Sequence, residues 1–304
     1  MDKTLRLLTG CTAAGKTALA LEWAERFGAE ILSCDSMLFY RGMTIGTAKP
    51  TPEEQARVPH HMIDLVAAGE TFSVGRYVPL ARDAVEEILG RGKRILVVGG
   101  SGFYLKSFFE PVVDEVAVDA GTRERVMRVK REGGLKRMTE ELLRLNPEGV
   151  GTLDLANPKR VARALERCWA SGRTLLELQA AFRRQPIPFA GFDKQVTVLD
   201  RHPAELNRRI ETRARQMIER GLIDEVRRLR EAGIERNPAA ARAIGYRETL
   251  AWLDAPNPGS TEDLVAEIAA NTRKLVKKQR TWFRGQLSEA RWLSGEEASA
   301  EVLF

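Results

Sequence analysis

The sequence of 304 residues predicts an α/β fold, a parallel sheet covered by helices, with an all-helical insertion domain. Two observations predict it. Short apolar runs alternate with amphipathic helical patterns, and these runs are too apolar for strands that expose one face to water, which is typical of parallel sheets. In the middle of the chain, helical patterns follow one another with no such run between them.

The first part of the chain supplies the alternation of strands and helices. The run at Leu5–Leu8 leads into a helical pattern that stops at Gly28, a residue suited to end a helix. Ser73 is the expected N-cap of a later helix. The expected strands are 5–8, 30–34 and 94–98, and the expected helices are 18–27 and 73–89.

The pattern changes at about residue 115. Helices are expected at 122–132, 135–145, 157–171 and 175–182, a strand at 195–199, and further helices at 204–219, 222–232 and 261–286. Asn157 followed by Pro158 is a favourable helix start. The simplest organisation is an α/β core made of residues 1–112 and 194–304, interrupted by a helical insertion at 113–193.

The composition is that of an ordinary globular protein, with 43% hydrophobic and 30% charged residues. No apolar run approaches the roughly 18–20 residues that a membrane span needs, and Asp2 and Lys3 begin an N-terminus without the apolar segment of a signal peptide. Three widely spaced cysteines form neither a disulfide framework nor a zinc pattern. We therefore expect a cytoplasmic protein without a membrane partner.

The positive charge is concentrated in the middle of the chain. The net charge is +6, and residues 120–195 carry 16 basic and 9 acidic side chains, a local excess of +7. Such an excess indicates contact with a polyanion, or else a set of solvated helix faces. Charge alone leaves both interpretations open.

A phosphate-binding loop is predicted between the first strand and the first helix. Gly10-Cys11-Thr12-Ala13-Ala14-Gly15-Lys16-Thr17 matches the P-loop pattern in its usual context, so the core is expected to be P-loop NTPase-like. Glycines let the backbone point several N–H groups at a diphosphate, and the helix N-terminus adds positive potential. Lys16 supplies a charge, and the Thr17 hydroxyl is placed to bind Mg²⁺.

The carboxylates near this loop are fewer than in a typical ATPase. The strand at Arg94–Val98 runs directly into Gly99-Gly100, where motor and switch NTPases have an aspartate.

Asp35 follows the second strand, so it should face the same crevice as the P-loop and can act as a general base there. A turn or N-cap role for Asp35 is the alternative. His60, His61 and Asp64 lack convincing metal-ligand spacing.

Beyond these features, the chain resembles the tRNA dimethylallyltransferase (tRNA isopentenyltransferase) family of the bacterial type. The matching strings run in family order from residue 10 to residue 284. They are the P-loop at 10–17, Ser33-Cys34-Asp35-Ser36, the stretches 40–50, 59–64, 98–105 and 157–166, Ala243-Ile244-Gly245-Tyr246-Arg247-Glu248, and the segments 271–273 and 279–284. An ordered set of this kind is far more specific than a P-loop alone.

The resemblance implies transfer of a dimethylallyl group from dimethylallyl diphosphate to N6 of adenosine 37, next to the anticodon of tRNA, with release of diphosphate. It implies Mg²⁺ as cofactor, Asp35 as general base, and Lys16 and Thr17 as residues that serve the diphosphate and the metal. The implied diphosphate-binding residues are Gly10, Thr12, Ala13, Ala14, Gly15, Lys16, Thr17 and Arg213. The implied tRNA-binding residues are Asp35, Ser36, Met37, Leu38, Ser101, Arg123, Lys159, Arg160, Val161, Ala162, Arg163, Arg242, Ala243, Ile244, Gly245, Tyr246 and Arg247.

Three positions depart from the family pattern without removing the chemistry. Cys11 replaces the usual proline, Ser101 stands where threonine is commoner, and Lys278 stands where arginine is commoner. The rival interpretations are a P-loop small-molecule kinase, a prenyltransferase for free adenine nucleotides, and a non-catalytic RNA-binding module. The kinase gives no role to the basic insertion, and the RNA-binding module leaves the P-loop and Asp35 unexplained. Nothing in the sequence demands a dimer, so we expect a monomer.

Overall fold

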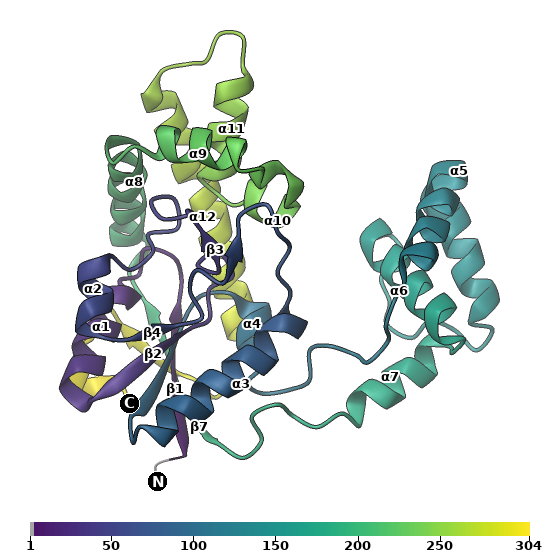
Figure 1. Ribbon diagram of the computed structural model, residues 1–304, viewed down its shortest axis with the longest axis horizontal. Coiled ribbons are helices and arrows are strands. Elements are labelled where there is room, and N and C mark those ends of the chain that lie inside the picture. Colours follow the sequence, from purple (N-terminus) through teal and green to yellow (C-terminus); the bar gives the residue numbers. More distant parts are fainter. Residues whose placement is uncertain (1–2) are drawn as a thin grey trace. The chain divides into compact units, whose positions relative to one another are not determined.

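A computed structural model (Figure 1) describes residues 3–304, and Met1 and Asp2, which open the expected core, lie outside the described residues. The chain divides into two compact units, one made of Met1–Phe109 and Pro188–Phe304 and the other of Glu110–Ile187. The second unit begins and ends slightly earlier than the expected 113–193. Phe189 explains the earlier end, because its ring stacks 4.6 Å from that of Phe108 in the core of the first unit.

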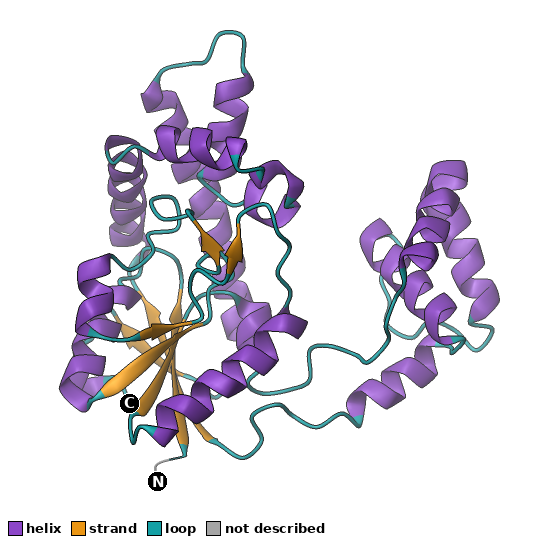
Figure 2. Cartoon of the chain, viewed as in Figure 1, coloured by secondary structure: helices purple, strands orange, loops and turns teal. Residues whose placement is uncertain are grey.

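A six-stranded parallel sheet organises the first unit (Figure 2). Its strand order is β4-β2-β6-β1-β7-β8, and every neighbouring pair is parallel. The strands are β1 (Thr4–Gly10), β2 (Ala29–Ser33), β4 (His60–His61), β6 (Arg94–Val98), β7 (Asp193–Asp200) and β8 (Arg291–Ser294). The predicted α/β fold is therefore confirmed. The predicted strands do not include β4 and β8, which are short and lie at the two edges of the sheet.

Alternating side chains of the central strands belong to two separate apolar clusters. Leu5 and Leu7 of β1 belong to the larger cluster, whereas Leu8 belongs to the smaller one. Helices α3 (Val74–Gly90), α8 (Pro203–Glu219) and α12 (Thr261–Gln286) contribute to the larger cluster. Helix α1 (Lys16–Phe27) and the C-terminal Leu303 contribute to the smaller one. Two buried faces explain why the strands are nearly continuous apolar runs.

The remaining helices of the first unit are short. They are α2 (Pro52–Arg57), α4 (Gly102–Lys106), α9 (Leu222–Glu231), α10 (Pro238–Ala241) and α11 (Tyr246–Asp254), with 3₁₀ turns at Ile234–Arg236 and Ala300–Val302. A separate parallel pair joins β3 (Tyr40–Arg41) to β5 (Val66–Ala67). The expected helices at 204–219, 222–232 and 261–286 correspond to α8, α9 and α12.

The second unit is entirely helical. It consists of α5 (Ala120–Leu145), α6 (Pro158–Ser171) and α7 (Leu175–Arg183). Gly134, with φ 61° and ψ −148°, breaks α5 between the two helices that the sequence predicts there. Asn146 links the elements, since its amide donates to the Leu142 carbonyl and accepts from the Leu175 N–H.

Within residues 3–304, no helix is both long and apolar enough to cross a membrane.

Candidate active site

The P-loop turns sharply between β1 and α1, as its glycines require. Gly10 has φ 146°, and a Cβ on it would lie 2.2 Å from the Leu199 carbonyl oxygen, so no larger residue fits. Gly15 has φ 101°, and Ala13 lies in the left-handed region at φ 63°. The loop is therefore held in a coiled conformation that L side chains rarely adopt.

Three side chains from distant parts of the chain hold this loop in place. The Arg201 Nε donates to the Ala14 carbonyl at 2.6 Å, and the Arg209 Nε donates to the Ala13 carbonyl at 2.8 Å. Gln279 of α12 accepts from the Thr12 N–H at 3.0 Å, and its Nε2 donates to the Gly100 carbonyl at 3.1 Å. The loop is thereby fixed to the turn after β6 and brought next to two guanidinium groups.

Lys16 is the charged group of the P-loop. Its Nζ donates to the carbonyls of Gly10 and Cys11, at 2.9 and 2.8 Å. Burial lowers the pKa of Lys16 to about 8; the Asp35 carboxylate opposes this shift and Arg213 adds to it. A bound anion would stabilise the charged form of this amine. Burial likewise lowers the pKa of the Arg213 guanidinium, whose NH2 donates to the Thr47 carbonyl at 3.2 Å.

Asp35 lies in the loop that follows β2, next to the P-loop. Its Oδ1 accepts from the Met37 N–H at 3.1 Å and lies 3.5 Å from the Ser101 hydroxyl. The Ser101 Oγ also accepts from the Ser36 N–H at 3.0 Å, which joins this loop to the start of α4. The Met37 bond is a turn contact of the kind considered as the alternative role. Only Oδ1 is used in this way, so among the described residues Oδ2 has no hydrogen-bond partner and can accept a proton.

Two cavities of the first unit meet at Asp35. The first, of about 660 Å³, is lined by Gly15, Lys16 and Thr17 of the P-loop and α1. The second, of about 810 Å³, is lined by Ser36, Met37 and Ser101. The residues that line both are Thr12, Asp35, Thr47, Gly100, Arg213, Met217 and Gln279. Groups bound in the two cavities can therefore meet beside the Asp35 carboxylate.

Both cavities are positively charged. The basic residues that line the first are Lys16, Arg208, Arg209, Arg213 and Arg220, against the acidic Asp35, Glu54 and Glu205. The basic residues that line the second are Arg213, Arg242, Arg247, Lys274 and Lys278, with Asp35 as the acidic one. Such linings attract anions and raise their local concentration.

The segment 242–247 lies at the second cavity, but its side chains differ in environment. Arg242, Ala243, Ile244, Tyr246 and Arg247 line the cavity, and the two arginines are exposed. Tyr246 is fully buried, and its hydroxyl donates to Glu225 at 2.7 Å. Its ring thus forms part of the cavity wall with the hydroxyl engaged, and the arginines are the groups of this segment that can reach a phosphate.

Leu38, also predicted to bind tRNA, lines the first cavity and not the second. The remaining predicted tRNA-binding residues belong to the second unit. Arg123 of α5 and Lys159, Arg160 and Arg163 of α6 are exposed, and Arg163 pairs with Glu166 at 3.2 Å. Val161 is fully buried in the core of this unit, and Ala162 is half-buried. The side chain of Val161 packs between helices, so a contact from that position would have to use the backbone.

The residues considered for a metal are engaged elsewhere. His61 contacts Glu30 at 2.6 Å, His60 Nδ1 contacts the Val58 carbonyl, and Asp64 binds Lys49. Over the described residues 3–304, no group of three or more His, Cys, Asp and Glu side chains could hold a metal ion. Thr17, exposed at the start of α1, lines the first cavity. A metal ion there could be bound by the Thr17 hydroxyl together with oxygens of a bound diphosphate.

Comparison with known proteins decides the family. A model described as IPP transferase matches residues 38–286, most of the chain. The chain belongs to this family. A second model, described as isopentenyl transferase, matches residues 3–71. The resemblance seen in the motifs is thereby confirmed.

Relatives and solved structures agree with this assignment. A tRNA dimethylallyltransferase of Opitutus terrae is 58% identical over 94% of this chain and 92% of its own length. One of Thermus thermophilus is 39% identical over 97% and 95%. The full-length tRNA isopentenylpyrophosphate transferase of Bacillus halodurans gives a TM-score of 0.68 at 31% identity, over 97% of this chain and 90% of that one. A eukaryotic dimethylallyltransferase acting on tRNA gives 0.81 at 26% identity, over 97% and 74%.

Proposed function

We propose that this IPP transferase transfers a dimethylallyl group from dimethylallyl diphosphate to N6 of adenosine 37 of tRNA and releases diphosphate. The observation that carries the proposal is the position of Asp35, where a cavity built on a P-loop meets a second basic cavity. The names of the relatives support the choice of both substrates. A tRNA substrate also makes the cytoplasm the expected location.

The first cavity would hold the diphosphate. The N-terminus of α1, the P-loop N–H groups and Lys16 all offer positive charge to its oxygens. When the bond between the allylic carbon and the diphosphate oxygen breaks, the departing oxygens gain negative charge. Fixed donors placed there before the reaction stabilise that charge without reorganising. Arg213, which lines both cavities, would add to this stabilisation from the side of α8.

Mg²⁺ fits this cavity only together with the diphosphate. Thr17 offers one hydroxyl oxygen, and Mg²⁺ in proteins is commonly held by few protein ligands, several waters and substrate phosphates. When bound, the ion would neutralise part of the leaving-group charge.

The second cavity would receive the adenine. Its exocyclic amine is a poor nucleophile because the lone pair is delocalised into the ring, so it needs orientation and a proton acceptor. Asp35 Oδ2 can take the proton as the new N–C bond forms, while Met37 and Ser101 hold the other oxygen. A base can reach this position only after leaving the anticodon stack, as in other enzymes that modify bases.

The basic surfaces would hold the RNA backbone. Arg242 and Arg247 line the second cavity, and Lys159, Arg160 and Arg163 form an exposed basic group on α6. Phosphate contacts of this kind position the RNA, and single-stranded loops are the parts of RNA whose bases can be splayed out.

An acceptor assay tests the proposed function. Radiolabelled dimethylallyl diphosphate is incubated with the protein, Mg²⁺ and one of three acceptors: unmodified tRNA, AMP or ATP. We expect label in tRNA alone. Label in AMP or ATP would indicate a free-nucleotide prenyltransferase, and phosphoryl transfer from ATP without prenyl transfer would indicate a kinase.

A second experiment tests the role of α6. Replacing Lys159, Arg160 and Arg163 by Ala removes charges that would otherwise neutralise tRNA phosphates and release counterions. The slope of log affinity against log salt concentration should fall in magnitude by about 2, at roughly 0.7 per contact. The affinity for dimethylallyl diphosphate should stay unchanged.

The matched control removes three charges of the first unit that line neither cavity. Lys3 precedes β1, and Lys93 and Arg94 lie where β6 begins, at the amino ends of the strands. Replacing these three by Ala should leave the salt slope near that of the wild type. Equal slopes for the wild type and the α6 variant would mean that the α6 residues form only a solvated helix face.

A further inference from the structure

Glu225 is a buried carboxylate that no step of the proposed reaction uses. It lies in the first turn of α9 and is 3% exposed. Its Oε2 accepts from the N–H groups of Thr44 and Ile45, at 3.2 and 2.8 Å. Its Oε1 accepts from the Gly46 N–H at 3.3 Å and from the Tyr246 hydroxyl at 2.7 Å. Four neutral donors from two distant segments thus converge on one carboxylate.

The first of these segments, the Thr44–Thr47 loop, forms part of the wall of the first cavity. Ile45 lines that cavity, and Thr47 lines both cavities. The Thr47 carbonyl accepts from Arg213 at 3.2 Å, so the position of the loop sets the position of that guanidinium. Three successive N–H groups turned toward one carboxylate leave the loop little freedom to move.

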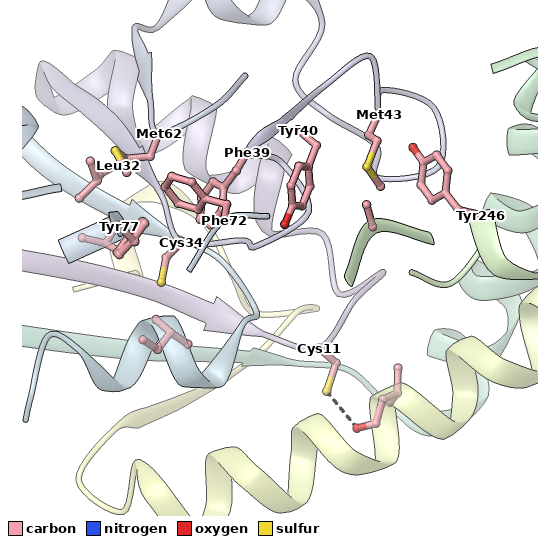
Figure 3. Close-up of a cluster of buried hydrophobic side chains, with 14 of the residues drawn as sticks. Cys11, Leu32, Cys34, Phe39, Tyr40, Met43, Met62, Phe72, Tyr77 and Tyr246 are labelled. Carbon is pink, nitrogen blue, oxygen red and sulfur yellow. Dashed lines mark hydrogen bonds between the residues drawn. The ribbon is translucent and has the colours of Figure 1, made fainter. Parts of the chain in front are cut away.

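The second segment is the start of α11, which contains Tyr246. Figure 3 shows this ring beside the loop that follows Met43. A Cβ on Gly46 would lie only 2.5 Å from the Tyr246 ring, so the ring and the loop are in direct contact. Burial, and then the charge of Glu225, raises the pKa of Tyr246, which keeps its hydroxyl protonated and donating. Arg247, the next residue, lines the second cavity.

We infer that Glu225 is a positioning residue that joins the two halves of the site, holding the loop that carries the partner of Arg213 to the segment that carries Arg247. The inference rests on the proposed function for the identity of the two substrates. It predicts that one carboxylate, which touches neither substrate, affects the binding of both.

Glu225→Gln tests the inference with little change in shape. An amide has one oxygen and one NH₂ group, so in either orientation the NH₂ faces at least one N–H that needs an acceptor. The loop should shift, and displacements of about 1 Å near reacting groups can cost on the order of 10²-fold. We expect kcat/KM to fall by roughly that factor and KM to rise for both dimethylallyl diphosphate and tRNA.

Glu30→Gln is the matched control. Glu30 is 4% exposed in the same unit and binds Arg91 and His61, outside both cavities. It should lower the thermal midpoint comparably but leave both KM values as in the wild type. Tyr246→Phe keeps the ring and removes one of the four donors, so it should give a smaller loss of the same kind. The double variant should cost less than the sum of the two single variants, because both substitutions act on the same contact.

The two proposals can fail separately. The affinity for inorganic diphosphate, measured by calorimetry, tests the position of Arg213 without any turnover. Glu225→Gln should weaken this affinity about tenfold, less than the roughly 10²-fold loss expected for a fully displaced group. Wild-type KM values and diphosphate affinity in Glu225→Gln, or an equal loss in Glu30→Gln, would overturn the inference. If Glu225→Gln does not fold, a Tyr246→Phe variant with unchanged KM values would overturn it. Failure of the wild type to modify tRNA would instead overturn the proposed function.

Discussion

Asp35→Asn should lower the single-turnover rate constant by roughly 10²–10⁴-fold, the contribution expected of a general base. The amide keeps the size of the carboxyl group and can still accept from the Met37 N–H with its oxygen. It cannot take the proton that the adenine amine releases. The affinities for tRNA and for dimethylallyl diphosphate should change much less than the rate, because the walls of the two cavities remain in place.

Ser101→Ala is the control for this substitution. It removes the hydroxyl that lies 3.5 Å from Asp35 Oδ1 and that accepts from the Ser36 N–H, but leaves the carboxylate. Its rate should therefore fall by much less than that of Asp35→Asn. A near-normal rate constant in Asp35→Asn would show that Asp35 is a turn residue and that the proton leaves by another route.

Lys16→Ala should lower kcat/KM for dimethylallyl diphosphate by roughly 10²–10³-fold, as when one preorganised donor to a developing negative charge is lost. The affinity for tRNA should be largely unaffected, because Lys16 lines the first cavity and not the second. Normal use of the donor with weak tRNA binding would contradict the assignment.

The pH dependence of donor binding tests the same group. The pKa of Lys16 is about 8 in the ligand-free protein, so the amine loses its charge as the pH rises through that value. A diphosphate favours the charged form, so above pH 8 binding takes up a proton and the affinity should fall by up to about tenfold per pH unit. Lys16→Arg keeps its charge and should remove this dependence. A fall of equal size in both proteins would mean that another group titrates.

The P-loop and Asp35 could be predicted because their signals are local. The spacing from Gly10 to Thr17 encodes the conformation of the loop, and a residue that directly follows a parallel strand must lie at the edge where ligands bind. The burial of Val161 also had a signal, since Val161, Leu165 and Cys168 recur at helical spacing on one face of α6.

The groups that hold the loops could not be predicted in this way. Arg201, Arg209 and Gln279 reach the P-loop from 187 to 267 residues away, so no local pattern marks them. Glu225 lies in a helix rich in charged residues and resembles its exposed neighbours until the fold brings three backbone N–H groups to it. Such contacts form only when distant segments pack together, so no local sequence pattern predicts them.

The proposed reaction is tested most directly by locating the transferred group on the RNA. Unmodified tRNA is incubated with the protein, Mg²⁺ and dimethylallyl diphosphate, digested with a base-specific nuclease, and analysed by mass spectrometry beside the Asp35→Asn reaction. The proposed reaction gives a single dimethylallyl group on N6 of the adenosine that follows the anticodon, formed by the wild type and nearly absent with Asp35→Asn in the same time. A group on another nucleotide, or equal yields from both proteins, would contradict it.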